Sequence, residues 1–216
     1  MWWNMAADMK SEFEDWHTHE HFPERLGVPG FLRSSRWTSA DGGEGVFVIY
    51  ELTDHQVLSS PGYLSRLNDP TPWSRKLMPF HKDMVRCQSH VLASHGSLTA
   101  RFAMNVRLAH APGEAARLAS SLGEAIGTLA ARPGLTGAHL LRHETPDISQ
   151  TTEQKIRGTP DQVADLVLLV TAYEEAPLRA LAAGELADPA LQAMGASASV
   201  RGLYSLSHSA VATDVR

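Results

Sequence analysis

Residues 15–25 read DWHTHEHFPER, and the first half of the chain is interpreted outward from this stretch. It holds three of the eleven histidines in the chain, and its spacing of apolar residues continues a short helical pattern that begins near Met9. Pro23 lacks an N–H group and its ring crowds the preceding turn, so the helix is predicted to end near Phe22.

A helical wheel with 100° per residue assigns the side chains of this stretch to faces. Met9, Phe13 and Trp16 form an apolar stripe, which predicts that one face of the helix is buried. Glu20 falls inside the stripe, with His17 and His21 at its edge. A buried carboxylate is costly unless it is paired or used in chemistry. Glu20 and its two histidine neighbours are therefore the first candidates for a functional site.

The composition limits the class of protein. At 216 residues the chain suits one large domain or two of about 100. A net charge of −5 without a Lys/Arg run argues against a nucleic-acid partner. No apolar run approaches the roughly 20 residues of a membrane span, and acidic residues interrupt the N-terminal region before a signal peptide could form. The single cysteine, Cys87, fits a reducing compartment, so we expect a soluble cytoplasmic protein without membrane partners.

The first half has alternating β and α patterns. We expect strands over residues 2–6, 31–38, 46–52 and 85–92, with the histidine-bearing helix after the first strand and helical pieces over 55–68 and 73–81. Asp41-Gly42-Gly43 is typical of a hairpin turn between the second and third strands. The order β-α-β-β-α-β is that of a ferredoxin-like fold.

The second half repeats this order. Strands are expected over residues 98–108, 135–143, 163–173 and 200–208, helices over 112–131 and 177–194, and a mobile polar hairpin loop over 145–162. Three short matches suggest an internal duplication: Pro29-Gly30 with Pro133-Gly134, Tyr50-Glu51 with Tyr173-Glu174, and Val85-Arg86 with Val200-Arg201. We therefore expect two ferredoxin-like repeats, residues 1–95 and 96–216.

An antiparallel sheet with helices on one face leaves its other face bare. We expect that face to carry Val48, Tyr50, Val167 and Leu169, which are too apolar to contact water. The predicted fold class is therefore α+β, with two antiparallel sheets packed together as an intramolecular α/β barrel. Its interior would hold a small hydrophobic molecule. The chain would be a monomer with an internal pseudo-dimer, or a homodimer.

The same stretch carries a resemblance to a known family. Residues 16–25, WHTHEHFPER, followed by Pro29-Gly30-Phe31, resemble the W-x-x-x-E-H-x-P-E-R…P-G-F pattern of EthD-like members of the dimeric α/β-barrel superfamily. Ser60-Pro61 and the loop ending at Trp73 are also similar to that group. The likeness in motifs covers about residues 2–92, and only the order of elements extends it to the second half.

The resemblance implies more about fold than about reaction. Relatives in the superfamily include cofactor-free monooxygenases, isomerases, polyketide cyclases and haem-binding enzymes. In EthD-like proteins the histidine before the proline is taken to face the cavity, which implies His21 here. In the second half Ala125 stands at the position that matches His21, so one asymmetric site is expected rather than two.

Roles for the candidate residues follow from their chemistry. His21 would exchange protons near neutral pH, Glu20 would orient the imidazole, and Tyr50 would donate to a developing oxyanion, so these three are the catalytic candidates. The substrate-binding candidates are Trp16, His17, Arg33, Arg36, Trp73 and Tyr204. Each has a structural alternative: the Glu20–His21 pair could tie the helix end to Arg25, the aromatic residues could be core, and His17 could lie at the surface.

The expected function is a cofactor-independent acid/base enzyme, an isomerase, cyclase or lyase, acting on a small hydrophobic and aromatic or polyketide-like compound. A monooxygenase of the same fold is one alternative, and a non-catalytic ligand-binding or stress protein is another. No cofactor is expected. Two cofactor alternatives stay open: haem, and a divalent metal at His17 and His21, whose i, i+4 spacing places both imidazoles on one helix face.

Overall fold

A computed structural model describes residues 1–215 and divides the chain into two compact units, which are treated separately. Unit 1 comprises Met1–Gln88, Thr145–Gln162 and the C-terminal segment from Ser207. Unit 2 comprises Ser89–Glu144 and Val163–Leu206. The expected boundary after residue 95 falls inside a strand of unit 2, and the segment 145–162 belongs to unit 1 although both of its flanks belong to unit 2.

Unit 1 has the β-α-β-β-α-β order that the sequence predicts. Its strands are β1 (Trp2–Met5), β2 (Phe31–Ser39), β3 (Gly45–Leu52) and β4 (His81–Val85). Its helices are α1 (Lys10–Trp16), α2 (Phe22–Leu26), α3 (Pro61–Asn68), α4 (Pro72–Leu77) and α6 (Thr152–Arg157). Short turns of helix are η1 (Ala7–Met9), η2 (His17–His21), η3 (His55–Ser59), η4 (Met78–Phe80) and η5 (Ala212–Asp214). The strands pair antiparallel in the order β4-β1-β3-β2, which is the ferredoxin-like order.

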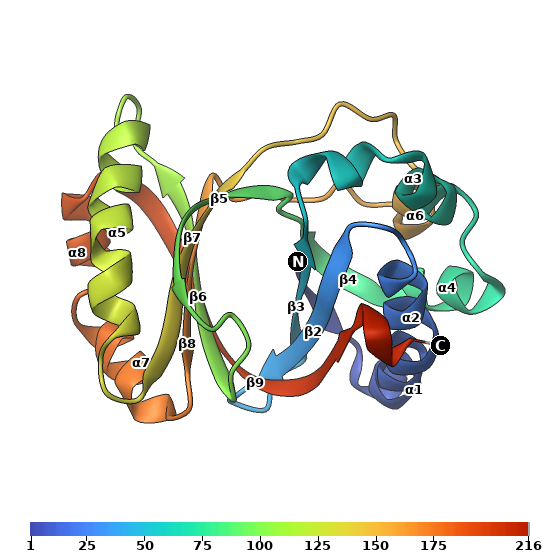
Figure 1. The fold of residues 1–216 in the computed structure, drawn as a ribbon, viewed down its shortest axis with the longest axis horizontal. Coiled ribbons are helices and arrows are strands. Elements are labelled where there is room, and N and C mark those ends of the chain that lie inside the picture. Colours follow the sequence, from blue (N-terminus) through green and yellow to red (C-terminus); the bar gives the residue numbers. More distant parts are fainter. Residues whose placement is uncertain (216) are drawn as a thin grey trace. The chain divides into compact units, whose positions relative to one another are not determined.

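Unit 2 has the same topology with one added strand. Its strands are β5 (Ser89–Gly96), β6 (Phe102–His110), β7 (Leu135–His143), β8 (Leu166–Ala172) and β9 (Ala196–Val211), whose last residues belong to unit 1. Its helices are α5 (Ala115–Ala130), α7 (Glu175–Ala183) and α8 (Asp188–Ala193) (Figure 1). The order β9-β6-β8-β7 repeats the order of unit 1, and β5 pairs with β7 at the edge. The α+β ferredoxin-like fold is confirmed, whereas the duplication of sequence and the packing of two sheets as a barrel stay predictions.

The prediction of a closing strand over residues 85–92 is wrong. Strand β4 ends at Val85, and the chain pairs again only from Ser89, where β5 joins unit 2. The break falls at Arg86, whose buried side chain donates to the hydroxyl of Tyr63 and whose N–H donates to the carbonyl of Gln162. These contacts turn Arg86 into the interior of unit 1, so strand pairing does not continue through it.

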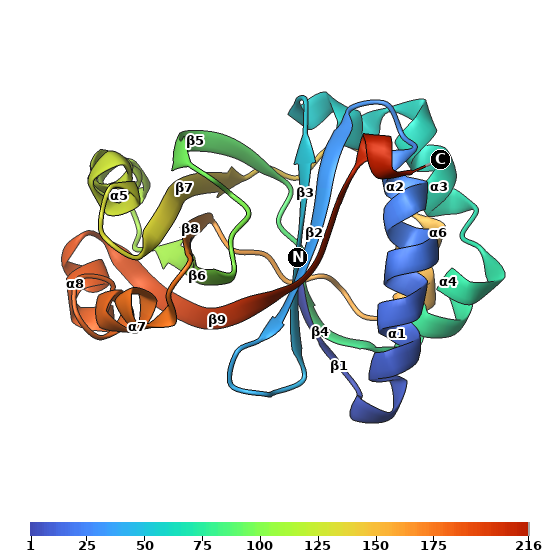
Figure 2. The ribbon, with the colours of Figure 1, turned by 60° about the horizontal axis from the view of Figure 1, so that its bottom comes forward.

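The helices of unit 1 cover one face of its sheet (Figure 2). Val46, Val48 and Trp3 pack with Phe13 and Trp16 in a core cluster, so they face the helices. The expectation that Val48 and Tyr50 lie on the bare face is therefore wrong, because Tyr50 also packs against this cluster. The opposite face carries Trp2, Phe47 and Trp37, whose rings stack with centroids 5.2 and 5.0 Å apart. In unit 2 Val167 and Leu169 do alternate with the helix-facing Leu166 and Leu168, as expected of a strand.

Residues 145–162 form an ordered part of unit 1 rather than a bare loop. Thr151 and Gln154 make a reciprocal capping box at the start of α6, which satisfies N–H groups at the first turn of that helix. None of the helices within residues 1–215 has the length and apolar character needed to cross a bilayer.

Candidate active site

A cavity of about 50 Å³ lies within unit 1, on the helix-covered side of the sheet. Residues from β1, α1, η2, α2, β3, α3, η4 and β4, together with segment 145–162, contribute to its wall. Its lining residues are Met1, Trp3, Trp16, His17, His21, Arg25, Tyr50, Tyr63, Met78, His81, Met84, Arg86, Glu153 and Arg157. The cavity is therefore enclosed by aromatic and ionisable side chains, a mixture typical of sites that orient small molecules.

A π-helical turn brings two histidines into the cavity wall. Residues His17–His21 form this turn, and the N–H of Phe22 bonds to the carbonyl of His17, five residues back. The wider turn gives Pro23 room and continues into α2, so the predicted end of the helix near Phe22 is wrong. Both His17 and His21 are buried, with ring centroids 5.3 Å apart and an interplanar angle of 26°.

The same turn places Glu20 away from the cavity lining. Its carboxylate accepts from the indole of Trp16 at 3.0 Å and from the hydroxyl of Thr71, and it lies 3.5 Å from Ser74 Oγ. Thr71 caps α4, so Glu20 connects the helix of the histidine stretch to α4. A helical wheel with a constant 100° per residue assigned Glu20 and His21 to one face, because it does not allow for the extra residue in a π turn.

Three imidazoles of the cavity wall are held neutral. Burial lowers the pKa of His17 and of His21 well below the ordinary value, and the charge of Arg36 acts in the same direction on His17, as that of Arg25 does on His21. Burial also lowers the pKa of His81 to about 4, against the opposing hydrogen bond with the carbonyl of Leu77. A neutral imidazole has a lone pair that accepts a proton, so these histidines are in the form that a general base requires.

The Nδ1 atoms of His17 and His21 have no hydrogen-bond partner among residues 1–215. Glu24 Oε2 lies 3.8 Å from His21 Nδ1, which exceeds hydrogen-bond distance. The hydroxyl of Tyr50 is likewise buried without a partner in this part of the chain, and burial raises its pKa, so it stays protonated and able to donate. Trp3 Nε1 and Arg157 Nε, also from the cavity lining, lack a partner among these residues as well, so five polar atoms of the lining residues are unsatisfied.

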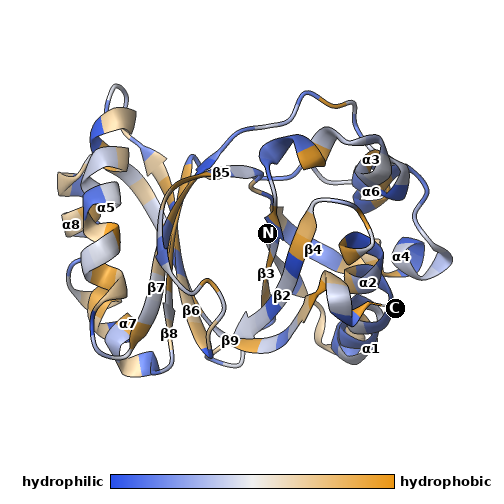
Figure 3. Ribbon diagram, viewed as in Figure 1, coloured by the Kyte–Doolittle hydropathy of each residue, from blue (hydrophilic) through white to orange (hydrophobic). Residues whose placement is uncertain are grey.

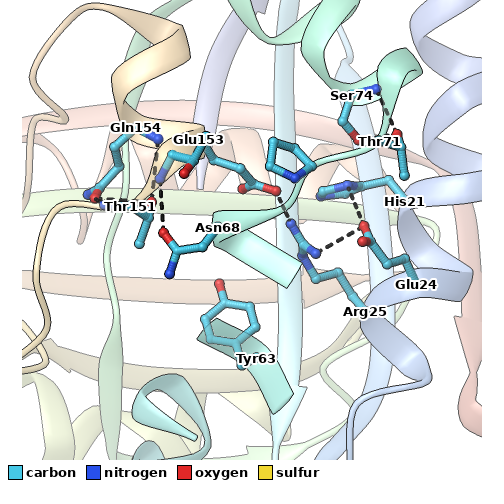
Figure 4. A network of polar contacts seen from close by, with 12 residues as sticks. His21, Glu24, Arg25, Tyr63, Asn68, Thr71, Ser74, Thr151, Glu153 and Gln154 are labelled. Atoms are coloured by element: carbon cyan, nitrogen blue, oxygen red, sulfur yellow. Dashed lines mark hydrogen bonds and ion pairs between the residues drawn. The ribbon is translucent and has the colours of Figure 1, made fainter. Parts of the chain in front are cut away.

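Arg25 is one of three arginines that line the cavity, together with Arg86 and Arg157 (Figure 4 shows Arg25). Its buried guanidinium donates to Glu153 Oε1 at 2.5 Å and to Glu24 Oε2 at 3.0 Å, and it lies 5.7 Å from the centroid of the Tyr63 ring. Burial disfavours the charged form, but the neighbouring carboxylate of Glu153 outweighs it, so the pKa of Arg25 is raised. Burial raises the pKa of Glu24 despite the opposing charge of Arg25.

Of the residues proposed from the sequence, four line the cavity: Trp16, His17, His21 and Tyr50. Arg33 lies outside the lining, 40% exposed, and pairs across the strands with Glu51 at 3.3 Å. Arg36 is buried, but it donates to the carbonyl of Glu14 and to Thr18, so it fastens α1 to β2.

The two remaining candidates lie elsewhere. Trp73 donates to Glu12 Oε1 at 3.2 Å and packs at the edge of the helix-side core. Tyr204 belongs to unit 2, where its ring covers Gly202: a Cβ on that glycine would lie 2.4 Å from the ring. Neither lines the cavity of unit 1.

Several cavity residues were not selected from the sequence. Arg25 stands in the quoted stretch, and its place three residues before the turn at Val28 gave no sign that it would be buried. His81 and Arg86 flank the fourth strand, where an alternating pattern would have assigned them to a face. Glu153 and Arg157 come from a polar segment with no recognisable motif, and only the tertiary fold brings them to the site.

The wall does not fit a haem or a single metal ion in this conformation. Pockets for drug-sized ligands and cofactors have volumes of about 300–1,000 Å³, well above the volume of this cavity. The rings of His17 and His21 stack, whereas two metal-binding imidazoles would direct a nitrogen of each ring at one point. The expectation that the protein has no cofactor stays a prediction, with haem and a divalent metal as its alternatives.

Comparison with solved structures finds the same fold over nearly the whole chain. An anthrone oxidase-like protein is 14% identical, covers 98% of this chain and 91% of its own, and has a TM-score of 0.65. A candidate monooxygenase from Fusobacterium nucleatum is 8% identical, with coverage of 97% and 91% and a TM-score of 0.62. A second, from Lactobacillus acidophilus, is 9% identical, with coverage of 98% and 93% and a TM-score of 0.58.

At these identities the likeness establishes the fold alone. No protein-family model matches the chain, and no curated protein matches it in sequence. These neighbours are described as an anthrone oxidase-like protein and candidate monooxygenases, and their likeness agrees with the predicted fold. The finer prediction of EthD-like membership stays a prediction.

Proposed function

We propose that unit 1 is the active part of an enzyme that oxygenates a small phenol, or its keto tautomer, with dioxygen and without a resident cofactor. The observation that carries this proposal is the pair of buried, neutral imidazoles, His17 and His21, in the wall of one cavity with Arg25. A neutral base beside a fixed cation is suited to forming a phenolate or enolate, the electron-rich species that reacts with dioxygen.

The chemistry balances with dioxygen as the only oxidant. An imidazole nitrogen of His21 takes the phenolic or α-carbon proton, and the guanidinium of Arg25 and the hydroxyl of Tyr50 stabilise the anion. The anion gives an electron pair to dioxygen, forming a C–O bond and a peroxide that is protonated by the imidazolium. Loss of one water then leaves a quinone, so phenol plus dioxygen gives quinone plus water.

Two further facts support an oxygenase over other small-molecule enzymes. Three structures with the same fold are described as an anthrone oxidase-like protein and candidate monooxygenases. The cavity, at about 50 Å³, holds dioxygen and a few waters as it stands, since one water needs about 10–15 Å³. An aromatic ring needs more room, so the proposal requires the wall to move outward when the substrate binds.

A second candidate function uses the same residues without oxygen. A neutral His21 that takes a proton from one atom and returns it to another would catalyse isomerisation, cyclisation or elimination. The unpartnered hydroxyl of Tyr50 favours this candidate as well, because it would donate to an oxyanion in either reaction.

Oxygen uptake and quinone formation test the proposal, with 1-naphthol and anthrone as substrates of two and three rings. We expect one oxygen consumed per quinone formed, above the spontaneous rate. The variant His21→Ala should lower kcat/KM by about 10²–10⁴-fold, the usual contribution of a general base. The control is His19→Ala, because His19 lies in the same π turn but is exposed.

The outcomes separate the candidates. Exchange of substrate C–H for deuterium in D₂O without oxygen uptake, lost in His21→Ala, would replace oxygenation by the acid/base reaction. Binding of either substrate without exchange or turnover would contradict both and indicate a carrier. Equal rates for His21→Ala and His19→Ala would remove His21 from the mechanism.

A further inference from the structure

We propose that Arg157 and Arg86 form an anion subsite in the cavity of unit 1, which selects substrates that carry a carboxylate or a phenolate. This inference depends on the proposed function only in calling the bound molecule a substrate. The subsite itself follows from charges and contacts on the segment 145–162 and on the end of β4.

The segment that carries Arg157 is built into unit 1 at both ends. At its start, the N–H of Thr152 donates to Asn68 Oδ1 at 3.1 Å, and Glu153 pairs with Arg25 (Figure 4). At its end, the N–H of Gln162 donates to the carbonyl of Met84 at 2.9 Å, and its carbonyl accepts from the N–H of Arg86 at 2.8 Å. Arg157 is therefore held in the wall by contacts that do not involve its own side chain.

The ionisable groups of the wall form two clusters with opposite excess charge. In the first, the guanidinium of Arg25 is shared by two carboxylates, those of Glu24 and Glu153. In the second, Asp161 is shared by two guanidiniums: Arg157 Nη2 donates to both of its oxygens at 2.9 Å, and Arg86 Nη1 lies 3.9 Å away. The second cluster therefore has one positive charge more than it has negative charges.

The second cluster also has a donor without an acceptor. Arg157 Nε is buried and has no hydrogen-bond partner among the described residues. The side chains of Arg157 and Arg86 are 7% and 8% exposed, so water compensates them poorly. A buried charged donor left unpaired is costly, and an anionic group in the cavity would remove that cost. Both arginines line the cavity, so a ligand there is within reach of them.

The chemistry of the guanidinium limits the ligand class. Its planar array of N–H donors matches the two oxygens of a carboxylate and binds a phenolate oxygen equally through charge-assisted hydrogen bonds. Arg157 and Arg86 share the single carboxylate of Asp161, whereas Arg25, the other arginine in the cavity lining, has two carboxylates to itself. The substrate would thus carry an acidic group besides its reacting phenol or α-carbon, and this group would bind as the anion at Arg157, with the reactive carbon toward the histidines.

Binding of two matched pairs of probes tests the subsite. Benzoate and benzamide have the same shape but differ in charge, and acetate and acetamide form a smaller pair that suits a cavity of about 50 Å³. Isothermal titration calorimetry measures the affinities, and the indoles of Trp3 and Trp16, which line the cavity, report occupancy by fluorescence. We expect the anion of at least one pair to bind about tenfold tighter than its amide, the difference typical of one charge-assisted hydrogen bond.

Variants assign the preference to the proposed residues. Arg157→Met and, separately, Arg86→Met should each reduce the preference for the anion to within about twofold, because either change leaves one guanidinium balanced by Asp161 and no carboxylate without a partner. The matched control is Arg179→Met on α7, whose side chain is 59% exposed and pairs with Glu175. It should leave the preference unchanged.

The proposal is overturned if anion and amide bind alike in both pairs, or if the preference persists in both Arg157→Met and Arg86→Met. These results are independent of turnover. Failure of oxygen uptake with a retained anion preference would reject the oxygenase and leave the subsite, whereas oxygen uptake without an anion preference would reject the subsite alone.

Discussion

Units 1 and 2 have the same order of strands and helices, but the helix that follows the first strand is built differently in each. In unit 2 that helix is α5, a regular helix whose residues Leu118, Leu122, Ile126 and Leu129 are buried at helical spacing. In unit 1 the corresponding stretch is α1, the π turn and α2, and it carries buried histidines and a buried arginine. The ribbon of α5 is mostly pale and orange in Figure 3, whereas that of α1 and α2 has more blue.

The difference shows that the fold does not by itself produce a site. The core cluster of unit 2 between helices and sheet consists of apolar residues, because a regular α5 presents only its leucine and isoleucine stripe. In unit 1 the π turn rotates His17 and His21 inward, and α6 from another part of the chain adds Glu153 and Arg157. A helix irregularity and an inserted segment therefore decide which unit has buried ionisable side chains around a cavity.

The largest predicted effect comes from a substitution that disrupts the polar interior of unit 1. Arg25→Met should destabilise unit 1 by about 3–5 kcal/mol, because it leaves the carboxylates of Glu153 and Glu24 buried without their counter-charge. The equivalent change in unit 2, Arg132→Met, removes a more exposed pair with Glu185 and should cost at most about 1 kcal/mol. Urea denaturation gives the size of each effect.

Hydrogen exchange by mass spectrometry would locate the loss, since it reports on the two units separately. Faster exchange in β1, β3 and β4 after Arg25→Met is the expected result. Equal costs for Arg25→Met and Arg132→Met would show that the polar interior of unit 1 contributes no more than a surface ion pair.

The second prediction concerns pH. The pKa of His81 is about 4 in the folded state and near 6.5 in an unfolded chain. Between these two pH values the unfolded state binds a proton at His81 and the folded state does not. The contribution of neutral His81 to the free energy of unfolding is therefore fully present above pH 6.5. It is lost as the pH falls toward 4, and the loss from His81 alone is about 3 kcal/mol. His17 and His21 act in the same direction.

Denaturation of the wild type and of His81→Leu at pH 7 and pH 4.5 measures this contribution. The variant should lose less stability between the two pH values than the wild type does. Identical losses would mean that His81 is protonated in the folded protein, and then the neutral state of the cavity would be in doubt.

The third prediction tests a turn that the two units have in common. Gly30 and Gly134 occupy equivalent turns, with φ of +98° and +85°. A Cβ would lie 2.4 Å from Val57 Cγ2 at the first position and 2.4 Å from Pro177 Cγ at the second. Alanine at either should cost about 1–2 kcal/mol or more, by strain and overlap together. Thermal unfolding of both variants checks this, and a large difference between them would contradict the equivalence of the turns.

The smallest predicted effect is a gain in stability. Gly123 lies inside α5, and a Cβ there would meet nothing within 4 Å. Gly123→Ala should therefore raise the stability of unit 2 by about 0.5–1 kcal/mol, because alanine has the higher helix propensity. Gly127→Ala, in the same helix and equally uncrowded, is the internal check on the shift in Tm. A loss of stability in both would show that α5 packs more tightly than its surroundings indicate.

The sequence by itself determined the elements and the class of fold. Alternating and helical periodicities predicted both β-α-β-β-α-β orders, because side-chain spacing reports which face of an element is buried. It also selected His17 and His21, because polar residues beside an apolar helical stripe need a reason to be there, and Tyr50, because its hydroxyl can donate to an oxyanion. The error at residues 85–92 arose where Arg86 turns inward, a contact that no local pattern contains.

The tertiary structure decided which of these residues share a cavity. A π turn changes the phase of a helix by one residue, so the direction of Glu20 could not follow from a regular wheel. Glu153 meets Arg25 across 128 residues of chain, and Arg157 and Asp161 follow on the same segment. Such contacts form only when burial and charge pairing act together in the folded chain. For this reason the sequence selected the two histidines, and only the structure showed what surrounds them.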